Sequence, residues 1–320
     1  MDCLNINCSN KSCQLAYYEA VYSFTQGDQL KIQGYWLASG ILGVTASTML
    51  RVLEHGADAV VTKSIGHTQR KGHQGPVLTE SHGGLINAVG LTNPGIDAIQ
   101  DELKFLQKAR ATFILSIFSE TPEGIAELAE QGSELGPSAL ELNLSCPHAE
   151  ISQISHSSQL TAQYVTAAKE VTRLPVFAKI TPNASDYVAV GKAAQDAGVD
   201  AIVAINTVRG MKIDIQQMKP VLGNRVGGLS GPPIFPIAVR CVYDLYNALS
   251  IPIIGVGGVS SWQDAIEMHL AGASAIQIGT AVMEDLDIFS KIKQGVKSYL
   301  KEKGYRDVSE LIGIAGGKQA

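Results

Sequence analysis

The sequence lacks several features that would each indicate a particular class of protein. Its five cysteines, Cys3, Cys8, Cys13, Cys146 and Cys241, are odd in number and too few for the disulfide framework of a small secreted domain. No apolar run approaches the roughly 20 residues that a membrane helix needs. The first residues, MDCLNINCSN, lack the charged and apolar regions of a secretion signal. These absences predict a soluble, cytoplasmic protein.

An excess of positive charge is also missing. The chain has 25 Lys and Arg against 30 Asp and Glu, a formal net charge of −5, and no basic stripe, so nucleic-acid binding is not indicated. Cys3, Cys8 and Cys13 lie five residues apart, but they form no CxxC pair and have no fourth ligand nearby. We therefore favour a tail with incidental thiols over a metal site, and we predict no metal.

Eight short apolar runs alternate with amphipathic stretches along the 320 residues. They span residues 34–38, 58–62, 112–117, 139–144, 176–180, 200–205, 252–256 and 274–278. Strands that are apolar throughout are expected where protein covers both faces of a sheet. Eight β–α units predict an α/β fold, a closed (β/α)8 TIM barrel. A doubly wound open sheet is the alternative, and the absence of GxGxxG after the first run weakens it.

The remaining segments predict the domain organisation. We expect residues 1–29 to be an N-terminal extension and residues 30–320 to be a single catalytic domain. Two long insertions, 63–93 and 206–232, are rich in Gly, Asn and Pro and follow the second and sixth runs. Both are expected to lie as long loops over the C-terminal mouth of the barrel.

Polar residues or glycines follow every predicted strand, where a barrel enzyme places its chemistry. They are Ser39, Lys63, Ser116, Asn143, Lys179, Asn206, Gly257, Gly258, Gly279 and Thr280. A buried lysine requires an anion or polar ligand, although a lysine can also extend to solvent. Two lysines that converge with Asn87, Asn143 and Asn206 therefore predict a ligand site.

Two glycine-containing stretches, GVGGVS after the seventh run and IGTAV after the eighth, indicate a phosphate site. Glycine allows backbone N–H groups to approach a phosphate closely, although it also serves ordinary turns. GGLSG (227–231) can supply further donors. The predicted ligand therefore carries a phosphate.

Cys146 follows the fourth run in ELNLSCPH, on a segment expected over the mouth. A thiol has a pKa of about 8.5, which is close enough to neutrality for a general base. The alternative is a buried structural cysteine, which is the interpretation that we favour for Cys241 inside an apolar helical pattern.

These motifs together resemble the class 1 dihydroorotate dehydrogenases, flavin enzymes of pyrimidine biosynthesis. The matching stretches are ASG (38–40), VVTKS (60–64), GGLINAVGLTNPG (83–95), ELNLSCP (141–147), AKITPN (178–183), AINT (204–207), GGLSGPPIFPIAVR (227–240), IIGVGGVSSWQDAIE (253–267) and AGASAIQIGTAV (271–282). INT followed by GGLSGP is most similar to the class 1B branch. The resemblance implies an FMN-binding catalytic domain that oxidises dihydroorotate to orotate, with an iron–sulfur flavoprotein subunit and NAD as electron-transfer partners.

The resemblance also implies roles for individual residues. Cys146 would remove the C5 proton of dihydroorotate while hydride leaves C6 for N5 of FMN, and Lys63 and Lys179 would complete the catalytic set. The implied substrate-binding residues are Lys63, Asn87, Ala88, Val89, Gly90, Leu91, Asn143, His148, Asn206 and Thr207. The implied FMN-binding residues are Ser39, Lys63, Ser64, Asn143, Lys179, Ile205, Gly231, Gly257, Gly258, Gly279 and Thr280.

His148 stands where the family usually has asparagine, and this histidine also occurs in the related dihydropyrimidine dehydrogenases. Its imidazole can donate to a substrate carboxylate or carbonyl, or influence the Cys146 thiol, and the alternative is that it faces water. A dihydropyrimidine dehydrogenase-like reductase therefore stays open. The lack of a CxxC-rich iron–sulfur segment disfavours the fused form of that enzyme.

Two further alternatives and the assembly also stay open. The alternatives are a phosphate-binding barrel lyase or isomerase without flavin and a catalytically silent binding subunit. The resemblance implies a homodimer or a heterotetramer.

Overall fold

The computed structural model describes residues 31–144 and 157–316. The N-terminal cysteines, Cys146 and His148 lie outside the described residues, so the predictions made for them stay predictions. The division into residues 1–29 and 30–320 also stays a prediction.

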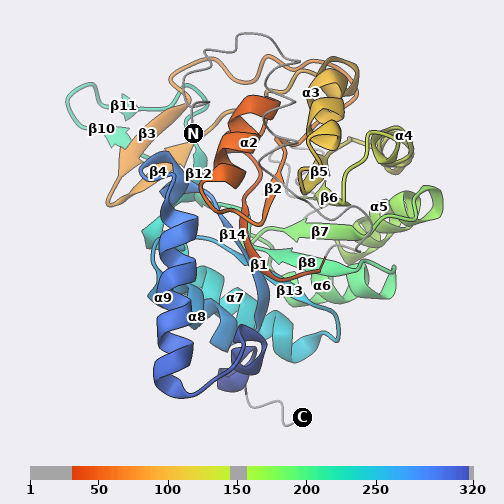
Figure 1. The fold of residues 1–320 in the computed structure, drawn as a ribbon. Helices are drawn as coiled ribbons and strands as arrows, with labels where there is room; N and C mark the ends of the chain where they lie inside the picture. Colours follow the sequence, from red (N-terminus) through yellow and green to blue (C-terminus); the bar gives the residue numbers. More distant parts are fainter. Residues whose placement is uncertain (1–30, 145–156, 317–320) are drawn as a thin grey trace, which may run out of the picture.

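A closed barrel of parallel strands forms the centre of the molecule (Figure 1). Its strands are β1 (Gly34–Leu37), β2 (Ala59–Val61), β5 (Phe113–Ile117), β6 (Ala139–Asn143), β7 (Val176–Ile180), β8 (Ala201–Ala204), β13 (Ile253–Val256) and β14 (Ala273–Ile278). Their order is β1-β14-β13-β8-β7-β6-β5-β2, and β1 pairs with both β14 and β2. Each strand overlaps one predicted run, so the predicted barrel is confirmed and the open sheet is excluded.

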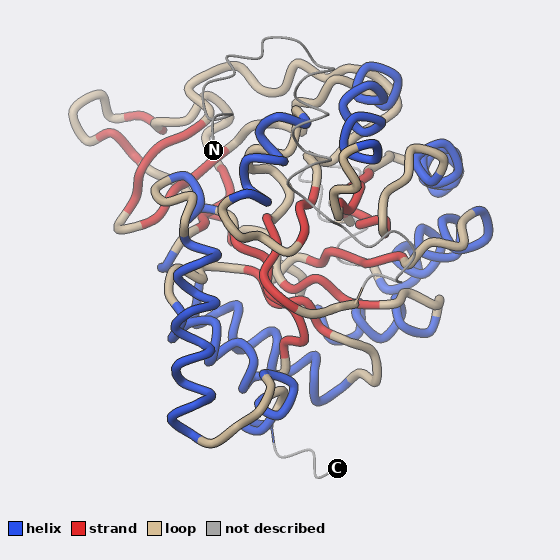
Figure 2. The backbone as a smooth tube through the Cα atoms, viewed as in Figure 1, coloured by secondary structure: helices blue, strands red, loops and turns tan. Residues whose placement is uncertain are grey.

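Helices surround the barrel, as the tube view shows (Figure 2). They are α2 (Ala46–Glu54), α3 (Ile96–Lys108), α4 (Pro122–Ser133), α5 (Ser158–Val171), α6 (Tyr187–Asp196), α7 (Phe235–Ala248), α8 (Trp262–Ala271) and α9 (Ile288–Lys303). Several begin at a side-chain cap: Thr121 accepts from the Gly124 amide and Ser261 from the Asp264 amide. The short 3-10 helices are η2 (Pro232–Ile234), η3 (Thr280–Met283), η4 (Val308–Leu311) and η5 (Ile314–Gly316).

The interior of the barrel holds its own apolar cluster, separate from the larger core between strands and helices. Trp36 and Phe177 stack inside it with ring centroids 6.2 Å apart. Because alternate residues of a barrel strand point inward, the residue two positions beyond Phe177 also faces the interior. That residue is Lys179, and the same alternation places Glu141 beyond Ala139 and Gln277 beyond Ala275. The interior therefore changes from apolar to polar toward the C-terminal strand ends.

The two long insertions contain strands that the sequence pattern did not predict. β3 (Leu78–Ser81) and β4 (Gly84–Asn87) come from the first insertion, and β9 (Val208–Gly210) and β12 (Gly227–Ser230) come from the second. They form one antiparallel sheet in the order β3-β4-β12-β9, and β10 (Ile213–Asp214) and β11 (Lys219–Pro220) form a separate hairpin. Figure 1 shows this sheet at one side of the barrel, with the hairpin at its periphery.

Glycine explains why β12 did not resemble a strand in the sequence. A Cβ at Gly227 would lie 2.5 Å from the Asn87 carbonyl oxygen, and one at Gly228 would lie 2.0 Å from Thr207 Oγ1. The glycines thus allow neighbouring chain segments to approach closely, which is one recognised role of glycine within a strand.

The small sheet connects opposite sides of the barrel. β2 and β8, which precede the two insertions, have three strands between them in either direction around the ring. Pairing of β4 with β12 therefore joins two diametrically opposed strand ends. Within the described ranges, no helix combines the length and apolar character required to cross a bilayer.

We expect Phe177→Ala to destabilise the protein by about 3–5 kcal/mol, because it opens a cavity inside the closed barrel where the ring is fully buried. Urea unfolding monitored by circular dichroism measures the change. Met218→Ala is the control, since that side chain is 86% exposed and its loss should change the free energy of unfolding by no more than about 0.5 kcal/mol. Equal effects of the two changes would contradict the assignment of the interior core.

Candidate active site

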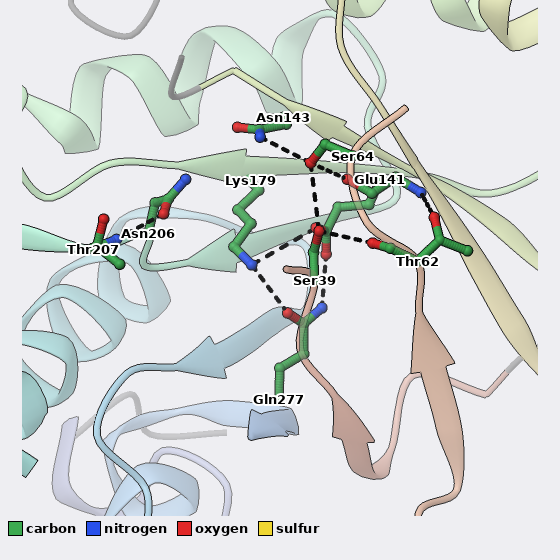
Figure 3. A network of polar contacts seen from close by, with 10 residues as sticks. Ser39, Thr62, Ser64, Glu141, Asn143, Lys179, Asn206, Thr207 and Gln277 are labelled. Atoms are coloured by element: carbon green, nitrogen blue, oxygen red, sulfur yellow. Dashed lines mark hydrogen bonds and ion pairs between the residues drawn. The ribbon is translucent and has the colours of Figure 1, made fainter. Parts of the chain in front are cut away.

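A buried ionic cluster lies inside the barrel beneath its C-terminal end (Figure 3). Lys179 on β7 places Nζ 3.4 Å from Gln277 Oε1 and 3.7 Å from Glu141 Oε1. Gln277 Nε2 donates to Glu141 Oε2 at 2.7 Å. The side chains of Lys179 and Glu141 are 7% and 0% exposed. Strands β6, β7 and β14 thus contribute one anion, one cation and one bridging amide.

A chain of hydroxyl groups joins the ends of neighbouring strands beside this cluster. Ser39 Oγ donates to the Thr62 carbonyl at 2.8 Å, and Ser64 Oγ lies 2.9 Å from Ser116 Oγ. Asn143 Nδ2 donates to Ser64 Oγ at 2.9 Å. The structure therefore brings the predicted residues Ser39, Ser64 and Asn143 together at the ends of β1, β2 and β6.

Lys63 follows β2 and contributes the second predicted lysine. Burial lowers the pKa of its ammonium group, because the charged form loses hydration in the folded chain. Its side chain forms no hydrogen bond or ion pair with the part of the chain that the structure describes. A half-buried ammonium without such a partner fits a position that contacts a bound acceptor group.

The predicted substrate-binding segments meet around Gly228. Asn87 pairs with Gly228 in the small sheet, and its Nδ2 donates to the Gly228 carbonyl at 3.3 Å. Asn206 Oδ1 accepts from the Thr207 amide at 2.8 Å, and Thr207 lies against the other side of Gly228. Residues 88–91 continue from β4, while Ile205 follows β8 and is buried.

A cavity of about 500 Å³ adjoins the predicted phosphate loops. Gly231, Gly258, Gly279 and Thr280 all line it, together with the turn between β3 and β4 and the side chain of Lys212. Thr280 Oγ1 donates to Ser230 Oγ at 2.9 Å on its wall. The structure thus gathers four predicted cofactor-binding residues from three loops around one space.

Gly257 is placed differently from its neighbour Gly258. It does not line the cavity, and a Cβ at this position would lie 2.8 Å from the Ala238 Cβ on α7. Its φ of +137° is a conformation that L side chains rarely adopt. The residue therefore allows the end of β13 to turn close to α7.

The fold and this site define a class of protein. A (β/α)8 barrel with a glycine-lined cavity, two lysines and several amide side chains at its C-terminal end is the arrangement of a cofactor-dependent barrel enzyme. In the described part of the chain, no group of three or more His, Cys, Asp or Glu side chains is arranged to hold a metal.

Comparison with known proteins identifies the family. The family model for dihydroorotate dehydrogenase matches residues 32–300. A protein of Methanosarcina mazei named dihydroorotate dehydrogenase B (NAD+), catalytic subunit, is 50% identical over 283 residues, which cover 87% of this chain and 90% of the relative. Relatives of the same name from Pyrococcus abyssi and Methanothermobacter thermautotrophicus are 49% and 43% identical, with 87% of this chain and 94% and 93% of theirs covered.

The chain therefore belongs to the dihydroorotate dehydrogenase family, in its class 1B branch, and the resemblance predicted from the motifs is confirmed. This is a family of flavin-dependent oxidoreductases. Membership favours the flavin enzyme over the lyase, isomerase and silent-subunit alternatives.

The structure adds polar residues that the sequence analysis did not predict. Glu141 and Gln277 lie inside apolar runs, and because Glu141 precedes Asn143 by two residues, both side chains point to the same inward face. Asn183 donates to the Thr207 carbonyl at 3.0 Å and accepts from the Arg209 amide at 3.0 Å, which fixes the segment after β8. The periodicity could have indicated the first two, whereas Asn183 depends on tertiary contacts alone.

We expect Lys63→Met to stabilise the cofactor-free protein at pH 7. Below both pKa values the buried ammonium opposes folding, and this opposition disappears as pH rises through the lowered folded pKa toward the ordinary value of 10.5. The melting temperature of the variant should exceed that of the wild type by about 2 °C, the shift produced by roughly 1 kcal/mol in a large domain.

Melting curves of both cofactor-free proteins between neutral and alkaline pH measure this difference, which should narrow as the pH approaches 10.5. A wild type that is the more stable at pH 7 would contradict the assigned burial cost.

Proposed function

We propose that this chain is the catalytic subunit of an FMN-dependent dihydroorotate dehydrogenase, which oxidises dihydroorotate to orotate in the synthesis of pyrimidine nucleotides. The observation that carries the proposal is the position of Lys63, Asn143 and Lys179 at the C-terminal ends of β2, β6 and β7, the end of the barrel where the glycines after β13 and β14 line a cavity. Family membership over residues 32–300 supports the same reaction.

The residues present fit FMN. In the proposed site, Gly231, Gly258, Gly279 and Thr280 hold the phosphate, because all four surround a cavity of suitable size. Ser39, Ser64, Asn143 and Lys179 bind the ring system. Ile205 and Gly257 complete the proposed set of FMN-binding residues. When bound, FMN supplies the acceptor for the hydride that leaves C6 of the substrate.

Substrate oxidation requires a base and a polar pocket in addition to the cofactor. Cys146 is proposed to take the C5 proton, since a thiol near neutral pH can serve as a general base. The proposed binding residues are Lys63, Asn87, Ala88, Val89, Gly90, Leu91, Asn143, His148, Asn206 and Thr207. Amide groups can satisfy both the donors and the acceptors of a pyrimidine ring, and Lys63 supplies a cation for the carboxylate.

The electrons are proposed to leave through a partner. The related proteins carry the words catalytic subunit and NAD+ in their names. We infer an iron–sulfur flavoprotein subunit as that partner in a heterotetramer, with the cytoplasm as the compartment. A homodimer that uses another oxidant is the alternative.

We expect dihydroorotate to bleach the flavin absorbance of the purified wild type under anaerobic conditions, and Cys146→Ala to slow this step by about 10²–10⁴-fold with FMN still bound. Stopped-flow spectroscopy measures the rate. Cys241→Ala is the matched control, because Cys241 is buried in the core and should not contact substrate.

Bleaching of the Cys146 variant at the wild-type rate would exclude Cys146 as the base. A dihydropyrimidine dehydrogenase-like activity, which His148 keeps as the second candidate, would instead show faster flavin reduction by dihydrouracil than by dihydroorotate.

We expect Thr280→Val to weaken FMN binding about tenfold and to leave riboflavin binding unchanged, since a hydrogen bond to a charged group contributes about 1.5–3 kcal/mol. Fluorescence titration of the cofactor-free protein with both ligands measures the two dissociation constants. Ser260→Ala is the control, because that hydroxyl lines the same cavity but donates to Asp264. An equal loss for FMN and riboflavin would place the phosphate elsewhere.

A further inference from the structure

Glu141 is a buried carboxylate that has no role in the sequence motifs or in the proposed reaction. It lies in the middle of β6, its side chain is fully buried, and its neighbours across the ladders are Phe177 and Ser116. Oε2 accepts from Gln277, whereas Oε1 has no hydrogen-bond partner among the described residues. That oxygen lies 3.7 Å from Lys179 Nζ.

A buried charge in this position is costly unless it is paired. A well-packed apolar side chain often stabilises a protein as much as a buried ion pair does, so packing alone does not account for a glutamate here. The carboxylate lies within the barrel interior, one inward-facing position below Asn143. The carboxylate therefore lies deeper in the barrel than the strand ends, where it can pair electrostatically with the Lys179 ammonium group.

We propose that Glu141 is a positioning residue that acts through Lys179: its carboxylate is the fixed counter-anion that holds the ammonium at the end of β7 and limits the positive charge offered to the cofactor. Gln277 completes the arrangement, because its amide group binds Glu141 on one side and Lys179 on the other (Figure 3). The inference rests on the proposed function, in which Lys179 contacts FMN.

The consequence concerns the equilibrium between oxidised and reduced cofactor. Two-electron reduction adds negative charge to FMN, and a nearby cation favours that charge. Glu141 offsets part of the cation and so keeps the midpoint potential lower than Lys179 alone would set it. The carboxylate thereby influences how readily electrons pass onward from the cofactor.

The test measures the midpoint potential of bound FMN in Glu141→Gln by spectroelectrochemical titration of the holoenzyme. This change removes the charge and retains the shape. We expect the ratio of reduced to oxidised FMN at a fixed potential to rise at least tenfold, which is a shift of about +30 mV for a two-electron couple. Glu102→Gln is the matched control, since its carboxylate binds the Ala46 amide outside the barrel and its loss should leave the potential unchanged.

A second background tests whether Glu141 acts through Lys179. Lys179→Met should lower the potential, because it removes the cation. Adding Glu141→Gln to this variant should then shift the potential less than it does in the wild-type background, because the ammonium group through which Glu141 is proposed to act is no longer present. An unchanged potential in Glu141→Gln with FMN bound would overturn the inference, and so would equal shifts in both backgrounds.

If Glu141→Gln alone does not fold, the double variant Glu141→Gln/Lys179→Met still tests whether the two residues form a pair. Removal of both charges of a buried pair is often tolerated, whereas removal of one is strongly destabilising. A folded double variant would then support the pairing, and a double variant that also fails to fold would overturn it.

The proposed function has a separate point of failure. If Lys179→Met leaves the potential unchanged with FMN bound, the proposed contact of Lys179 with the cofactor is wrong and the inference falls with it. If that change lowers the potential but Glu141→Gln does not alter it, only the role of Glu141 fails.

Discussion

Closure of the barrel is the constraint on which the rest of this structure depends. Because each strand pairs on both sides, its side chains have only two directions, into the barrel or toward the helices. Trp36 and Phe177 fill the lower interior, and the next inward positions on β6, β7 and β14 carry Glu141, Lys179 and Gln277. The polar side chains therefore pack directly against a close-packed apolar layer, which limits how far they can move.

Much of the fold could be predicted from the sequence, for a clear physical reason. A parallel strand covered on both faces must be apolar along most of its length, so runs such as VFAKI and PIIGV stand out without any knowledge of contacts. Polar residues near the ends of these runs also stand out, so Lys63, Asn143 and Lys179 could be predicted to belong to one site. The strands of the insertions could not be predicted in this way. In β12, for example, Gly227 and Gly228 resemble turn residues in the sequence, but the structure requires them because neighbouring segments approach closely.

The rest of the candidate site depends on tertiary contacts, which a sequence pattern does not reveal. Gly257 and Gly258 are adjacent and identical in type, yet one packs against α7 and the other lines the cavity. Asn183 supports Thr207 from a distant part of the chain. Glu141 could not be assigned to the site from the sequence because the other residues of its run are mostly apolar. Its ion pair with Lys179 is visible only in the structure.

The sheet that joins β4 to β12 makes two distant insertions depend on each other. Its two halves come from insertions more than a hundred residues apart in sequence, and each half supplies the hydrogen-bond partners of the other. Deleting either half would expose an unpaired strand edge, which proteins avoid because it invites aggregation. Neither insertion can therefore complete its strand pairing by itself, and a change in the length of β4 or β12 alters the hydrogen bonding of both segments.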